Sequence, residues 1–188
     1  KSLNVPAVEV LERLGPPRFV AQLRRGGLKL DLPRGSEPNL SVILGGAAVN
    51  LEGLVGAYTA FARGGVAGRP RYTADAPRFE ARLMSAGAAF IVRDILEAGG
   101  PHARHVEGGV GARRGIAWKT GTSFGFRDAW AVGVSDRYTV GVWVGRPDGT
   151  PNPGFFGANV AAPLLVDVFS AIESASAPQR TPPPEVTQ

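Results

Sequence analysis

The chain has 188 residues, of which 44% are hydrophobic and 20% are charged, and its net charge is +5. This length suffices for one domain that buries roughly 70% of the surface exposed by its unfolded chain. The absence of cysteine excludes disulfides and thiolate metal sites. No stretch reaches the ~18 consecutive apolar residues of a membrane span. The basic residues stand singly or in pairs, which argues against a nucleic-acid-binding surface.

The first part of the chain predicts three helices. The first begins at Asn4, which can cap a helix, and ends at Gly15-Pro16. A second short helix covers residues 17–25, and residues 28–44 are typical of a loop because prolines and glycine interrupt them. The third helix follows Asn50, another candidate cap, and two consecutive glycines end it.

The middle of the chain predicts one extended stretch, one helix and a loop. Residues 66–79 have an extended pattern, which two prolines restrict to the edge of a sheet. A helix over about residues 85–97 should bury its apolar side chains, Ile91, Val92, Ile95 and Leu96. The Gly-rich loop 102–115 contains His102 and His105, but two histidines without cysteine usually face solvent. We therefore expect no metal and no cofactor.

Residues 116–146 predict three β-strands, because apolar and small side chains alternate on both arms of a hairpin around a polar turn at 135–137. A last helix over about 161–175 would align Leu164, Val168 and Ile172, and the Pro-rich residues 176–188 predict a linker or a disordered tail. Helices around an antiparallel hairpin predict an α+β fold, with an antiparallel sheet flanked by helices.

The strand before the hairpin carries an unusual group of side chains, Lys119-Thr120-Gly121-Thr122-Ser123. Lysine occurs only at positions 1, 29 and 119, whereas arginine is used throughout. Glycine in a strand lets a ligand or another backbone approach closely, and a free strand edge can bind an extended peptide as an added strand. The run therefore offers a cation, hydroxyls and a docking edge for a peptide that ends in a carboxylate.

A second candidate group lies at the start of the chain, where Ser2-Leu3-Asn4 precedes the first helix. One interpretation is that Ser2 or Asn4 only caps this helix. The functional interpretation treats Ser2 as a proton relay and Asn4 as an amide that binds substrate. The two interpretations remain open on these residues alone.

Several short runs follow one another in a specific order: Ser2-Leu3-Asn4-Val5-Pro6-Ala7, Leu44-Gly45-Gly46, Ala57-Tyr58, Ala62-Arg63-Gly64-Gly65-Val66, and Lys119-Thr120-Gly121-Thr122-Ser123 with Asp128 and Trp130 downstream. Together they resemble the transpeptidase domain of class A penicillin-binding proteins, whose motifs include Lys-Thr-Gly. The run 118–149 looks most like the 1C branch. The resemblance covers about residues 1–175 and implies an incomplete penicillin-binding transpeptidase or serine β-lactamase fold.

The resemblance implies a serine D,D-transpeptidase that cross-links peptidoglycan stem peptides ending in D-Ala-D-Ala and that penicillins acylate. On this basis Ser2 relays protons, Asn4 binds a substrate amide, and Lys119 supplies positive charge. Thr120 and Thr122 would bind the terminal carboxylate, with Gly121 and Ser123 completing the substrate-binding run. The backbone N–H of Thr122 would be one donor of an oxyanion hole.

The implied nucleophile, a serine in Ser-x-x-Lys, is absent, because no serine here is followed by a lysine three residues later. We expect residues 1–175 to be the C-terminal part of a transpeptidase domain, inactive unless the missing N-terminal part of the same protein supplies this motif. An upstream anchor would hold the parent protein at the periplasmic face of the inner membrane. Two other functions remain open: a non-catalytic sensor of β-lactams or stem peptides, and a β-lactamase.

Overall fold

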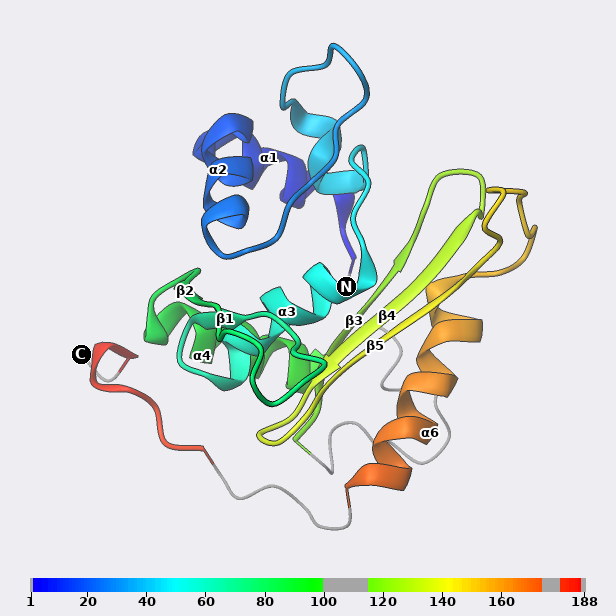
Figure 1. Cartoon of the computed structure of the whole chain (residues 1–188). Helices are drawn as coiled ribbons and strands as arrows, with labels where there is room; N and C mark the ends of the chain where they lie inside the picture. The colour runs from blue at the N-terminus through cyan, green and yellow to red at the C-terminus, as the bar shows by residue number, and fades with distance from the viewer. Residues whose placement is uncertain (1, 100–114, 174–179, 187–188) are drawn as a thin grey trace.

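The computed structural model describes residues 2–99, 115–173 and 180–186. Its central element is a three-stranded antiparallel sheet in the order β3-β4-β5. The strands are β3 (Ala117–Thr122), β4 (Asp128–Val134) and β5 (Thr139–Gly145). Helix α3 (Leu51–Ala62) contacts β4 and β5 on one side of the sheet, and α6 (Ala162–Ile172) contacts the same strands from the other side (Figure 1). The matched antiparallel strands and flanking helices confirm the predicted α+β fold.

A separate helical group lies above the sheet in Figure 1. It consists of α1 (Asn4–Leu14), α2 (Pro16–Arg25) and the short 3-10 helix η1 (Leu40–Leu44). Both predicted helices are confirmed. The expectation of a loop over 28–44 is wrong at its end, because Asn39 accepts a hydrogen bond from the Ser41 N–H and starts η1. This local side-chain cap stabilises a single turn in a stretch of low helical propensity.

A small hairpin extends α3 at its C-terminal end. Strand β1 (Val66–Gly68) pairs in antiparallel fashion with β2 (Glu80–Arg82). The prediction of an extended stretch over residues 66–79 included β1 but not β2. A strand of three residues is too short to show an alternation of apolar and polar side chains in the sequence. The pairing depends on packing of the hairpin against α3, where Ala67 is completely buried.

The two faces of the sheet have different roles. Side chains of Trp118, Ala129 and Val142 belong to a buried cluster that includes Leu165 and Phe169 of α6. The alternate positions, which include Lys119 and Trp130, therefore face the side of α3. Gly141 confirms this assignment, since a Cβ there would lie 2.5 Å from a methyl carbon of Val55 in α3.

Helix α6 packs through a different face from the one predicted. Leu165 and Phe169 are buried, whereas Leu164 and Ile172 are exposed. The physical reason lies in the sheet: a Cβ at Gly133 would come within 2.8 Å of the Phe169 ring. The small residue on β4 thus makes the space that the aromatic ring fills.

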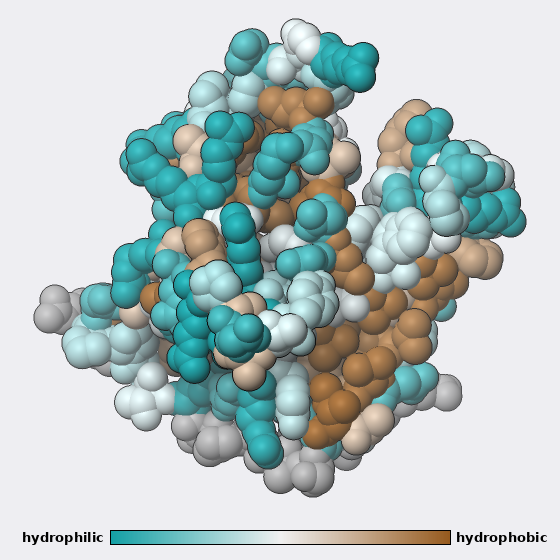
Figure 2. All heavy atoms as spheres, in the orientation of Figure 1, coloured by the Kyte–Doolittle hydropathy of each residue, from teal (hydrophilic) through white to brown (hydrophobic). Residues whose placement is uncertain are grey.

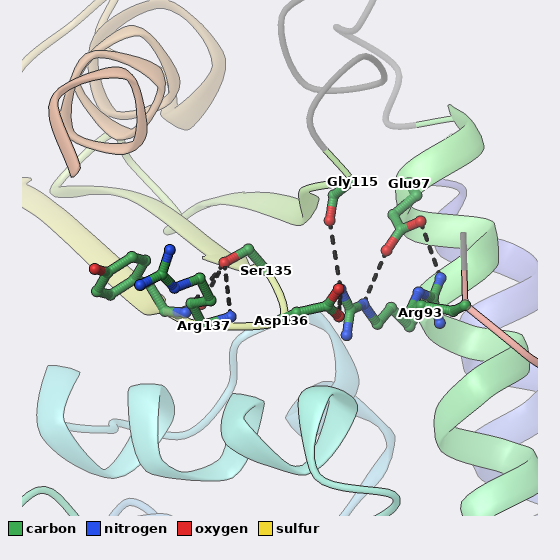
Figure 3. A network of polar contacts seen from close by, with 8 residues as sticks. Arg93, Glu97, Gly115, Ser135, Asp136 and Arg137 are labelled. Atoms are coloured by element: carbon green, nitrogen blue, oxygen red, sulfur yellow. Dashed lines mark hydrogen bonds and ion pairs between the residues drawn. The ribbon is translucent and has the colours of Figure 1, made fainter. Parts of the chain in front are cut away.

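Helix α4 (Ala86–Gly99) also turns a different face inward. The prediction that its apolar side chains are buried is wrong for three of the four, and the fourth, Leu96, is half-buried. Ile91, Val92 and Ile95 are exposed, whereas Arg93 is only 1% exposed. Its guanidinium forms ion pairs with Glu97 (2.8 Å) and with Asp136 in the β4–β5 turn (2.6 Å). Figure 3 shows this network, in which Arg93 also donates a hydrogen bond to the carbonyl oxygen of Gly115. The face of α4 that points inward therefore carries a charge network that joins the helix to the β4–β5 turn.

The last described segment, residues 180–186, packs on α4. Arg180 pairs with Glu97 at 2.9 Å, its guanidinium lies over the Phe90 ring, and η3 (Pro184–Val186) contacts the helix. The predicted linker or tail begins at 176, and its residues 176–179 and 187–188 lie outside the described part. Among the described residues, no helix has the length and apolar character required to cross a membrane.

Candidate active site

The predicted site residues line one large groove of about 1340 Å³. It runs between the helical group of α1 and η1 and the free edge of β3, where Figure 2 shows the surface hollowed. Ser2 and Asn4 line it from the start of the chain, and Lys119–Ser123 line it from the strand. Residues more than 110 positions apart in the sequence therefore meet at one surface, as the motif-based hypothesis requires.

Strand β3 presents this motif on an open edge. Among the described residues its only strand partner is β4, with Lys119 opposite Val132 and Gly121 opposite Trp130. Lys119 and Gly121 face the side of α3, while Thr120 and Thr122 face the side of α6. Both sets line the groove. In general, the outward backbone groups of an edge strand can pair with an extended peptide.

Lys119 is half-buried, and burial lowers the pKa of its ammonium from the usual 10.5. Its Nζ donates a hydrogen bond to the carbonyl oxygen of Thr120. No carboxylate among the described residues forms an ion pair with it, in contrast to Lys29, which pairs with Asp31 at 2.7 Å. Lys119 is thus a poorly compensated cation that faces the groove, a suitable partner for an anion or a reacting hydroxyl.

Gly121 has space around it. A Cβ there would meet only the Cβ of Trp130, at an ordinary 3.6 Å, and its φ is not positive. Neither the fold nor the backbone conformation of the described chain therefore requires glycine at this position. A glycine with this open space would allow a ligand to approach the strand closely.

Thr122 is fixed by the segment that precedes α6. Its Oγ1 accepts a hydrogen bond of 3.0 Å from the N–H of Gly157, the first residue of the π-helical turn η2 (Gly157–Ala161). A Cβ at Gly157 would lie 2.4 Å from the Gly121 oxygen, so only glycine permits this approach. Because a hydroxyl both donates and accepts, Thr122 keeps its own proton for a further hydrogen bond.

Ser123 shapes the β3–β4 turn. Its Oγ accepts a 2.9 Å hydrogen bond from the N–H of Asp128, and its own N–H donates to the Asp128 carbonyl oxygen. The turn contains Gly125 and Phe126 at positive φ, which a short connection between these strands requires. The described geometry therefore gives Ser123 a structural role at the rim of the groove.

Ser2 and Asn4 do not cap the first helix. The N-cap position belongs to Leu3, and no side-chain cap hydrogen bond is present. The expectation that Asn4 caps this helix is wrong, because the helix already includes Asn4 as its first residue. Both polar side chains are exposed at the groove, and Ser2 has a φ of +50°, which is uncommon for a residue other than glycine.

Among the further residues that line the groove and were not predicted as site residues are Asp31, Tyr58 and Asn159. Burial raises the pKa of Tyr58 to about 12, so this phenol stays protonated at neutral pH. Asn159 accepts a hydrogen bond from the Phe156 N–H and donates to the Gly154 oxygen, which fixes the loop before α6. Only Tyr58 had a detectable signal, its position in the Ala57-Tyr58 motif.

Two tryptophans form part of the sheet face near the groove. Trp130 and Trp143 lie opposite each other on β4 and β5, with ring centroids 6.3 Å apart, and Trp143 Nε1 donates to Asp128 Oδ1 at 2.9 Å. This arrangement agrees with a packing role for the pair. His102 and His105 of the Gly-rich loop lie outside the described residues, and the described part of the chain contains no cluster of three potential metal ligands.

Comparison with known proteins supports the interpretation of the motifs. No family model matches the chain. The chain is 52% identical to penicillin-binding protein 1C of Escherichia coli (strain K12) over 191 residues, which cover 100% of this chain and 24% of that protein. It is 27% identical to penicillin-binding protein 1A of Clostridium tetani (strain Massachusetts / E88), over 86% of this chain and 23% of that protein. The chain thus spans about a quarter of the length of these relatives.

A solved structure shares the fold. The crystal structure of penicillin-binding protein 1A from Haemophilus influenzae superposes with a TM-score of 0.74 at 20% identity, over 97% of this chain and 35% of that one. The sequence identity along the whole chain, the shared fold and the order of the short sequence motifs all agree. The chain is homologous over its entire length to a portion of the class A penicillin-binding proteins.

Proposed function

We propose that this chain forms part of a serine D,D-transpeptidase that cross-links peptidoglycan stem peptides and is acylated by penicillins. The observation that carries the proposal is the groove in which Ser2 and Asn4 lie across from the Lys119–Ser123 edge. The names of the relatives, all penicillin-binding proteins, support the same activity. The parent protein would act on the periplasmic face of the inner membrane, held there by an anchor outside this sequence.

In the proposed mechanism, the missing Ser-x-x-Lys motif enters the groove from a segment outside this sequence. Its serine attacks the carbonyl carbon of the D-Ala-D-Ala bond, the D-Ala amine leaves with a proton, and the amine of a second stem peptide later displaces the serine from the ester. Ser2 transfers the proton toward the leaving amine, and such a relay contributes about 10²–10⁴-fold. Asn4 binds an amide of the substrate beside it.

The β3 edge binds the substrate in this mechanism. The stem peptide, or a penicillin in its place, lies along the strand as an added strand. Thr120 and Thr122 donate hydroxyl protons to the terminal carboxylate, and the free proton of Thr122 is oriented by its bond from Gly157. The N–H of Thr122 stabilises the oxyanion, the kind of donor whose removal costs roughly 3 kcal/mol.

Lys119 supplies the positive charge of the site. Because burial lowers its pKa, the ammonium gains from any anion or partial negative charge that enters the groove. It would stabilise the substrate carboxylate and hold Ser2 in a state ready for proton transfer. An arginine could not substitute fully, since its wide planar group cannot act as a compact charge.

The test uses fluorescent penicillin and the intact mass of the protein. The 188-residue chain alone should give no adduct, whereas the same chain supplemented with the upstream part of its parent protein should gain one penicillin. In the supplemented protein Lys119→Ala should abolish the adduct, while Lys29→Ala, whose exposed partner is Asp31, should leave it intact. An adduct on the chain alone, or equal adducts in both variants, would refute the proposed site.

The same experiment separates the alternative functions. A transpeptidase releases D-Ala from a stem-peptide substrate, whereas a sensor module holds the penicillin adduct without releasing D-Ala. A β-lactamase would hydrolyse the penicillin and lose the adduct within minutes. Release of D-Ala by the supplemented protein is the outcome that the proposal requires.

A further inference from the structure

A second cavity, of about 210 Å³, lies between the C-terminal end of α3 and the β1–β2 hairpin. None of its lining residues belongs to the groove described above. Its walls carry four arginines, accompanied by Gly68, Phe79 and Glu80; the arginines are Arg63, Arg69, Arg71 and Arg78. Hydrophilic side chains gather over this hairpin in Figure 2.

The fold holds two of these guanidinium groups in place. Arg63, which ends α3, forms an ion pair with Glu80 of β2. A Cβ at position 68 would lie 2.8 Å from Arg63 Nη1, so Gly68 provides the space that this side chain occupies. Arg69 lies over the Phe79 ring at 4.4 Å from its centroid, a cation–π contact that orients its N–H groups.

Arg71 and Arg78 come from the segment that joins the two strands. Arg71 Nη1 donates hydrogen bonds to the carbonyl oxygens of Ala74 (2.9 Å) and Ala76 (3.1 Å), which closes the segment. Within the described chain, Glu80 is the only carboxylate that forms an ion pair with any of the four arginines. Arg78 has no such partner there.

The local charge is strongly positive. Residues 63–82 contain five arginines and two carboxylates, so this segment carries +3 of the chain's net charge of +5. The second carboxylate, Asp75, accepts a hydrogen bond from Thr73, which lowers the pKa of its carboxyl group, and it does not line the cavity. Glu52, on α3, accepts a hydrogen bond from the hydroxyl group of Tyr72. Neither acid neutralises the cavity.

Grouped guanidinium groups repel one another unless an anion lies between them, and the one available carboxylate is already used by Arg63. A phosphoryl group carries about −1.5 to −2 charges and three acceptor oxygens, which matches several guanidinium forks better than a single carboxylate does. The volume equals roughly seven water molecules at ~30 Å³ each. That is room for a phosphate or a diphosphate.

We propose that this arginine-lined cavity binds the phosphoryl group of a phosphorylated ligand, independently of the transpeptidase groove. Arg69 and Arg78 contact the phosphoryl oxygens, while Arg63 and Arg71 set the shape of the site. The phosphoryl group can belong to a soluble phosphate or diphosphate, or to the headgroup of an anionic lipid, and the two sources share this recognition chemistry.

The test measures binding of inorganic phosphate and pyrophosphate to the whole chain by calorimetry in a phosphate-free buffer. Arg69→Gln/Arg78→Gln should weaken pyrophosphate binding at least tenfold, whereas the charge-matched Arg24→Gln/Arg25→Gln at the end of α2 should leave it within twofold. Lys119→Met should also leave it unchanged, which separates this site from the groove. Thermal unfolding of each variant verifies that it remains folded.

Two controls can overturn the proposal. Acetate that binds as tightly as phosphate would refute the phosphoryl assignment, and equal weakening in both double variants would show a general charge effect. Absence of pyrophosphate binding at millimolar concentration would also refute it. Vesicles of phosphatidylglycerol, compared with phosphatidylcholine, identify the source: binding that needs Arg69 and Arg78 and that pyrophosphate displaces indicates a lipid headgroup, whereas pyrophosphate binding without vesicle binding indicates a soluble ligand.

Discussion

Replacing Arg93 by methionine should destabilise the chain more than any exposed arginine replacement. The guanidinium is buried, and it neutralises Glu97 of its own helix and Asp136 of the β4–β5 turn. At such distances each pair has a Coulomb energy of about 6 kcal/mol for an effective dielectric constant of ~20. Desolvation offsets most of this energy in the native protein, but a variant that removes one partner leaves the carboxylates uncompensated.

The expected loss follows from the exposure of the partners. Removing one member of a buried ion pair typically costs about 3–5 kcal/mol. The side chain of Asp136 is 32% exposed, and Glu97 keeps its pair with Arg180, so water and Arg180 compensate part of the loss. We therefore expect the lower limit, about 3 kcal/mol.

Urea unfolding followed by circular dichroism measures this loss. With a slope near 2 kcal/mol per molar urea, the midpoint should fall by about 1.5 M. Arg24→Met, on the surface of α2, is the matched control and should change the free energy of unfolding by less than about 0.5 kcal/mol. Asp136→Asn in the Arg93→Met background should add little to the loss in the free energy of unfolding. A loss for Arg93→Met below about 1 kcal/mol would refute the reasoning that this charge network orients α4.

Three further predictions follow from the described geometry. Gly133→Ala should cost about 1–3 kcal/mol, because its methyl would press on the Phe169 ring, and Phe169→Leu in the same chain should recover part of that loss in urea unfolding. Lys119→Met should raise the free energy of unfolding at pH 7, because it removes the cost of burying the charged ammonium. Burial lowers the pKa of Lys119, so the wild type has this full cost at any pH below the folded-state pKa. The stability gained by the variant should therefore vanish as the pH approaches 10.5, the usual pKa of the group. Tyr58→Phe should remove the Tyr58 phenol, whose pKa burial raises to about 12. Between pH 10 and 12 the variant should lose less stability than the wild type, because it lacks this group, whose folded-state pKa lies above its unfolded value. An unchanged ultraviolet titration would contradict this assignment.

Much of the local structure could be predicted because its causes are local. Alternation of side chains placed β4 and β5, and Asn50 caps α3 through the hydrogen bond it accepts from the Gly53 N–H. The Lys119–Ser123 run was recognisable as a chemical motif without any coordinates. These signals depend on residues within one turn or one strand of each other, so no distant contact was needed to interpret them.

The tertiary structure decided which face of each helix is buried. Periodicity alone favoured Ile91 and Ile95 on α4 and Leu164 on α6, yet charge pairing turned Arg93 inward, and the space above Gly133 admitted Phe169. The same holds for the groove: its two sides come from the first residues of the chain and from β3, and only packing of the helical group beside the sheet edge brings them together. The sequence by itself determined the strands, the caps and the chemical motifs, because each depends on near neighbours. Their relative placement depended on the tertiary structure, because burial free energy and charge compensation involve residues far apart in the chain.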